Sequence, residues 1–122
     1  LQAVLDLYDE RSYQTANAIS QLGSLLNEKR EPTAWRYNAT ALMISELIFG
    51  KEDLHTADKL INLGNLYRDL GDQGEAISTL ERAYEIQRKA LGDAHPTTIR
   101  ARFSLGFAMM FCESLASASW SR

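Results

Sequence analysis

The sequence has few of the residues that build loop-rich or strand-rich folds. Its 122 residues include 2 prolines, 7 glycines and 1 cysteine. So few turn-forming residues argue against a loop-rich or all-β fold. The single cysteine, Cys112, cannot form an internal disulfide, so the chain does not require an oxidising compartment. The first residues show no basic leader of a secretory signal. We therefore expect a cytoplasmic, intracellular protein.

Charge and long apolar runs are also lacking. Thirteen Lys and Arg residues against 16 Asp and Glu residues give a net charge of −3. Nucleic-acid binding requires a concentrated basic surface, so we expect no nucleic-acid partner. No stretch of 18 apolar residues occurs, and we therefore expect no membrane span. Apolar residues still make up 45% of the chain, enough for an ordinary folded core.

A repeat of about 42 residues organises what is present. The Leu-Gly pairs lie 41 and 42 residues apart, and several alanines keep the same phase. The repeated positions are Leu22-Gly23, Leu63-Gly64 and Leu105-Gly106, together with Ala34 and Ala76, and Ala41 and Ala83. Repeats of this length indicate an array of small units that bury their apolar faces against one another.

Apolar residues recur at spacings of three and four within each unit, which predicts two amphipathic helices per unit. The expected helices cover residues 13–28, 33–49, about 56–70, 76–91 and 97 onward, and residues 1–7 look like the tail of an earlier helix. We expect one domain over residues 1–122, as part of a longer array. It divides into the end of a preceding helix (1–10), a first repeat (11–52), a second repeat (53–95), and a partial third repeat with a tail (96–122).

The central unit carries a recognisable pattern. Leu60-x-x-Leu63-Gly64-x-x-Tyr67, followed by Ala76, Leu80 and Ala83, closely resembles the tetratricopeptide repeat (TPR). The 42-residue period and the string Leu91-Gly92-Asp93-Ala94-His95-Pro96 resemble the longer variant found in kinesin light chains and many scaffold proteins. In the first unit, Asn38 replaces the usual large apolar residue of the second helix. The resemblance implies an all-α, right-handed superhelical stack of antiparallel helix pairs, an α-solenoid.

The resemblance also implies which residues face a partner, because the first helix of each pair lines the inner wall of such a stack. The implied positions are Asn17, Ser20, Ser24 and Asn27 in the first unit, Asp58, Ile61, Asn62, Asn65 and Arg68 in the second, and Arg100, Phe103, Phe107 and Met110 in the third. Asparagine amides both donate to and accept from a peptide backbone. We expect an extended peptide or protein segment with acidic and hydrophobic anchors.

Two other functions are alternatives to this interaction scaffold. In the first, exposed terminal helices mediate homo-oligomer formation and the groove has no ligand. The apolar cluster at residues 103–111 fits either packing against a further helix or a ligand groove. The second is an enzyme, and the residues argue against it. The two histidines, His55 and His95, are expected to cap or hydrogen-bond within loops, and Cys112 to be buried and inert. We therefore expect no catalytic residues, no metal site and no cofactor.

Overall fold

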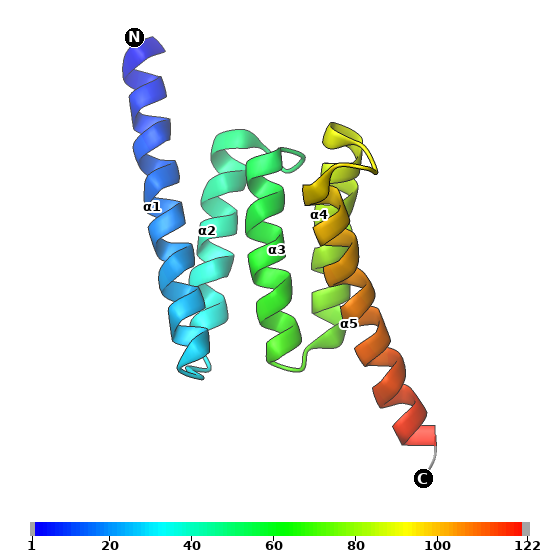
Figure 1. The fold of residues 1–122 in the computed structure, drawn as a ribbon. Helices are drawn as coiled ribbons and strands as arrows, with labels where there is room; N and C mark the ends of the chain where they lie inside the picture. Colours follow the sequence, from blue (N-terminus) through cyan, green and yellow to red (C-terminus); the bar gives the residue numbers. More distant parts are fainter. Residues whose placement is uncertain (1, 121–122) are drawn as a thin grey trace.

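This computed structural model describes residues 2–120, and the side chains of residues 2–3, 7 and 10–110. Five helices make up the described part of the chain. They are α1 (Gln2–Glu28), α2 (Ala34–Phe49), α3 (Leu54–Asp69), α4 (Gln73–Leu91) and α5 (Pro96–Trp120). No strand occurs within residues 2–120. Neighbouring helices run antiparallel, and connections of three to five residues join them (Figure 1). The predicted all-α stack of helix pairs is confirmed.

The helix bounds agree with the sequence pattern except at the N-terminus. A separate helix ending within residues 1–10 is wrong, because α1 runs without a break from Gln2 to Glu28. Neither proline nor glycine occurs before Gly23, so nothing in this stretch interrupts a helix. The first turns of α1 extend past α2 in Figure 1.

Short capping motifs set the ends of α2, α3 and α4. Asp53 accepts a hydrogen bond from the backbone N–H of His55 at 2.8 Å and so starts α3. Asp72 accepts from the N–H of Glu75 at 3.4 Å at the start of α4. Gly50 and Gly92 terminate α2 and α4 with φ of 94° and 87°, a left-handed conformation that favours glycine.

The first two Leu-Gly pairs lie where the helices of their pairs cross closely. A Cβ atom placed on Gly64 would lie 2.7 Å from Cγ of Leu80 on α4. A Cβ atom on Gly23 would lie 2.8 Å from Nδ2 of Asn38 on α2. Both glycines are therefore required for the close crossing of α1 with α2 and of α3 with α4. The third glycine, Gly106 on α5, has no described atom within 4 Å of this position.

Small buried residues fill the remaining crossings. Ala34, Ala41, Ala76 and Ala83 on α2 and α4 are buried, as their common phase in the sequence indicates. Ala57, Leu60, Ala83 and Ile86 form the core cluster between α3 and α4. The first helices of the pairs also contact one another, since α3 touches both α1 and α5. Helices α1, α3 and α5 therefore form one continuous wall of the molecule.

A matched pair of glycine substitutions tests this packing. Gly64→Ala should lower the free energy of unfolding by about 1–3 kcal/mol, because the new methyl group overlaps Leu80. Gly106→Ala meets no atom and should raise it by about 0.5–1 kcal/mol through helix propensity alone. Urea unfolding measures both changes. Equal effects of the two substitutions would contradict the assigned helix crossing.

Candidate functional site

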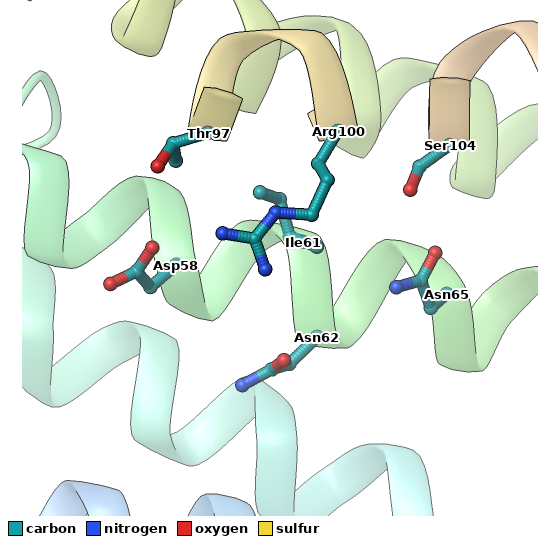
Figure 2. Close-up of a pocket in the computed structure, with 7 residues that line it drawn as sticks. All are labelled: Asp58, Ile61, Asn62, Asn65, Thr97, Arg100 and Ser104. Carbon is teal, nitrogen blue, oxygen red and sulfur yellow. The ribbon is translucent and has the colours of Figure 1, made fainter. Parts of the chain in front are cut away.

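A cavity of about 370 Å³, here called cavity A, opens between α3 and α5. Its lining residues are Asp58, Ile61, Asn62 and Asn65 of α3 and Thr97, Arg100 and Ser104 of α5. Figure 2 shows Arg100 reaching from α5 into the middle of the cavity, toward α3. The cavity thus holds one carboxylate, one guanidinium and several neutral polar groups around the apolar side chain of Ile61.

A second cavity of about 280 Å³, cavity B, lies between α1 and α3. Its lining residues are Ser24, Asn27 and Glu28 of α1 and Asn62, Asn65, Leu66 and Asp69 of α3. Asn27 donates through Nδ2 to Oδ2 of Asp69 at 2.9 Å and ties the two helices together. The lining contains two carboxylates and no lysine or arginine, so cavity B has a negative electrostatic potential.

Asn62 and Asn65 line both cavities and so occupy the centre of the wall. The two residues lie one helical turn apart on α3, with Cβ atoms about 5–6 Å apart. Oδ1 of Asn65 is buried and has no hydrogen-bond partner among the described residues. An unpaired buried acceptor costs about 1–3 kcal/mol, so this oxygen favours a ligand that brings a donor. In Figure 2 it points toward the α5 side of the cavity.

Ser20 does not face the solvent. Its side chain is only 3% exposed, and its hydroxyl donates to Oδ1 of Asn38 at 2.8 Å. Nδ2 of Asn62 in turn donates to Oγ of Ser20 at 3.1 Å. The expectation of a ligand-facing Ser20 is therefore wrong, because the polar residue Asn38 draws this hydroxyl into the α1–α2 interface.

Asn17 likewise contributes to helix packing. Its Oδ1 accepts a hydrogen bond from Nζ of Lys59, and Lys59 also lies 5.3 Å from the ring centroid of Tyr13. Burial lowers the pKa of Lys59, whose side chain is almost fully enclosed. Burial also raises the pKa of the Tyr13 hydroxyl. Asn17 lines neither cavity and instead anchors α1 to α3 through Lys59.

On α5 the structure separates the predicted residues. Arg100 lines cavity A, whereas Phe103 and Phe107 are 72% and 61% exposed and line neither cavity. Met110 is also exposed. The guanidinium of Arg68 lies 5.3 Å from the ring centroid of Phe107 and makes a cation–π contact across the α3–α5 interface. The three apolar side chains are exposed because no described helix packs on the far side of α5.

The two histidines serve as local hydrogen-bonding and packing groups. Nδ1 of His55 lies 2.7 Å from Oδ1 of Asp53, and its ring stacks on Phe49 with centroids 4.1 Å apart. Nδ1 of His95 accepts from the backbone N–H of Thr97 at 3.1 Å. The predicted hydrogen-bonding role agrees with these contacts, but His55 lies in the first turn of α3 and not in a loop. No group of three potential metal ligands is found among the described side chains, and the prediction for Cys112 lies outside them.

Sequence reasoning missed five of the cavity residues. Thr97 and Ser104 lie three and four positions from Arg100, on the same face of α5, and this spacing could have identified them. Glu28 and Asp69 are the last residues of α1 and α3. Asp69 lies 42 residues after Asn27, so the repeat period could have identified it. Leu66 forms part of both the core and the cavity lining. The missed carboxylates are what make cavity B acidic.

Asp58 is the ionisable group of cavity A whose pKa is raised. Burial raises the pKa of its carboxyl group, and the nearby charges of Lys59, His55 and Arg100 counteract this only in part. The folded state therefore holds the Asp58 proton more tightly than the unfolded state. The ionised carboxylate thus destabilises the fold above the raised pKa, and this cost disappears as the pH falls below the ordinary aspartate pKa of about 3.9.

Asp58→Asn should therefore raise the free energy of unfolding near pH 7. The gain should shrink as the pH falls through the ordinary range of aspartate, because the wild-type carboxyl group then becomes neutral as well. Urea unfolding of both proteins across this pH range checks the expectation. A loss of stability near pH 7, or a gain that persists in acid, would show that burial does not dominate at Asp58.

Comparison with known proteins assigns the family. Two overlapping segments, residues 14–89 and 55–109, match the model of the tetratricopeptide repeat and together span more than half of the chain. No curated protein matches the chain as a relative. Within residues 2–120, no helix combines the length and apolar character that crossing a membrane requires. Repeats of this kind generally mediate protein–protein interactions and typically form non-enzymatic scaffolds. The chain belongs to the tetratricopeptide repeat family.

Proposed function

We propose that the wall formed by α1, α3 and α5 binds an extended segment of a partner protein across Asn62 and Asn65, without catalysis. The unpartnered, buried Oδ1 of Asn65 carries this proposal. It lies at the junction of two cavities whose linings come only from these three helices. A cytoplasmic location and a likeness to the 42-residue variant of kinesin light chains stay predictions.

The spacing of the central amides suits an extended backbone. Side chains one helical turn apart are separated by about 5–6 Å. In an extended segment, successive N–H groups on the same side are two residues apart, or about 6–7 Å. Asn62 and Asn65 can therefore contact two such groups of one peptide. Binding through main-chain groups requires no particular side chains, so specificity would come from the flanking cavities.

The cavities favour anchors of opposite charge. The lining of cavity B combines the carboxylates of Glu28 and Asp69 with the apolar side chain of Leu66, which suits a lysine or arginine with its aliphatic stem. Cavity A offers the guanidinium of Arg100, which suits an acidic side chain beside the backbone contacts. The sequence predicts a partner segment with acidic and hydrophobic anchors. The acidic lining of cavity B adds a basic anchor to that segment.

Peptides selected on the wild-type protein from a random display library test the proposal. Asn65→Ala should weaken their binding by about 0.5–1.5 kcal/mol through loss of one hydrogen bond, and Arg100→Ala by about 1.5–3 kcal/mol through loss of a charged one. Isothermal titration calorimetry measures both changes. Leu47→Ser is the matched control, because Leu47 is 81% exposed on α2 and lines neither cavity. Unchanged affinity in both wall variants would contradict the proposal.

Self-association through α5 is a second candidate function. Phe103, Phe107 and Met110 are exposed together on this helix, and Gly106 has open space where Gly23 and Gly64 each contact a second helix. Clusters of exposed apolar side chains favour protein contacts. This surface shares no residue with the linings of the two cavities. Arg68, which contacts Phe107, also lines neither of them.

A double substitution, Phe103→Ser with Met110→Ser, separates the two functions. If α5 mediates self-association, the substitution should weaken it by about 1.5–3 kcal/mol for each large side chain that the contact buries. Sedimentation equilibrium over a range of protein concentrations measures this change. A mass that does not depend on concentration in the wild type would contradict self-association, and the selected peptides should bind the variant normally.

A further inference from the structure

A buried chain of hydrogen bonds connects the wall to the interior of the first helix pair. Nδ2 of Asn62 donates to Oγ of Ser20 at 3.1 Å, and Ser20 donates to Oδ1 of Asn38 at 2.8 Å. Ser20 and Asn38 are buried, whereas Asn62 is exposed and lines both cavities. The orientation of a surface amide is thus coupled to a residue inside the α1–α2 interface.

The chemistry of serine gives this chain a direction. A hydroxyl group has one proton to donate. Because Ser20 donates its proton to Asn38, its other contact must come from a donor, which is the amide nitrogen of Asn62. In Figure 2 this nitrogen points away from α5. The carbonyl oxygen of Asn62 is therefore the end of the amide that a ligand can reach.

Packing alone does not explain an asparagine at position 38. Asn38 contacts Gly23 in the first pair as Leu80 contacts Gly64 in the second, so this crossing accommodates an apolar side chain. Nδ2 of Asn38 is buried and has no hydrogen-bond partner among the described residues. A leucine would leave no such group unpaired. The polar side chain must therefore provide a benefit that offsets the free-energy cost of this unpaired nitrogen.

We propose that Asn38 is a specificity-determining positioning residue. Its side chain accepts the hydrogen bond that the Ser20 hydroxyl donates, and this fixes Asn62 so that its carbonyl oxygen faces a ligand on the wall. Its consequence for binding rests on the function proposed above. The wall then presents two acceptors, from Asn62 and Asn65, and selects segments that supply N–H donors. Without Asn38, Ser20 can donate to the oxygen of Asn62, and the amide can turn its nitrogen toward a ligand.

Two substitutions test the proposal without any ligand. Asn38→Leu reproduces the arrangement at Leu80, and Ser20→Ala removes the hydroxyl that both amides contact. Hydrogen exchange of the Asn62 side-chain NH₂, measured by NMR, should be about 2- to 10-fold faster in each variant than in the wild type, because one hydrogen bond protects it. Leu47→Ser on α2 should leave the rate unchanged. Equal exchange in the wild type and both variants would overturn the proposal, and Ser20→Ala decides alone if Asn38→Leu does not fold.

Binding of a peptide selected on the wild type from a random display library is the second readout. Asn38→Leu and Ser20→Ala should each weaken it about 2- to 10-fold, whereas Leu47→Ser should not. Faster exchange with unchanged affinity would overturn the role of Asn38 in specificity. Failure of the wild type to select any peptide sensitive to Asn65→Ala would overturn the proposed function instead, and the exchange rates would still decide how Asn62 is oriented.

Discussion

The absence of a side chain at Gly23 and Gly64 is the constraint on which the rest of the structure depends. At each position, a Cβ atom would lie within 3 Å of a side chain from the partner helix. The helices of each pair can therefore cross closely enough to bury the alanines between them. The pairs stack so that α3 contacts both α1 and α5, and these three helices form the wall. The two cavities follow from this spacing.

The wall itself is held largely by polar contacts. Three hydrogen bonds join α1 to α3 between residues 42 positions apart: Lys59 to Asn17, Asn62 to Ser20 and Asn27 to Asp69. Such contacts contribute less to stability than apolar burial, since each replaces a hydrogen bond to water. They do fix directions, because donors and acceptors must match. The same residues that join the repeats therefore set which groups the wall presents.

The sequence predicts the fold well because the fold depends on periodic features. Leu-Gly pairs, alanines in phase and glycine-terminated helices recur. In the first two repeats, Gly23 and Gly64 lie at the helix crossings and the alanines are buried. The end of α1 at Glu28 agrees with the prediction, but the expected boundary near residue 10 does not occur, because no proline or glycine before Gly23 interrupts the helix. The site was predicted in part: Asp58, Asn62, Asn65 and Arg100 line cavities, whereas Ser20 is buried by its contact with Asn38. That contact depends on Asn38, which departs from the repeat pattern. The periodicity of the sequence does not reveal which residue Asn38 contacts.

The exposed apolar side chains of α5 also show what the repeat pattern does not predict. Phe103 and Phe107 occupy repeat positions that correspond to inward ones of α3, yet both are exposed because no described helix continues the wall beyond α5. A repeat position acquires its environment from the neighbours on both sides. No described helix lies beyond α5, so Phe103 and Phe107 have a described neighbour on one side only.

Mapping a bound peptide by NMR tests the central claim most directly. A display-selected peptide is titrated into the ¹⁵N-labelled protein, and backbone and side-chain amide shifts are followed. We expect the largest changes at Asn62, Asn65 and the cavity residues of α1 and α5, with the outer face of α2 around Met43 and Leu47 unaffected. Changes centred on the outer face of α2 around Met43 and Leu47, or on Phe103 and Met110 alone, would contradict it.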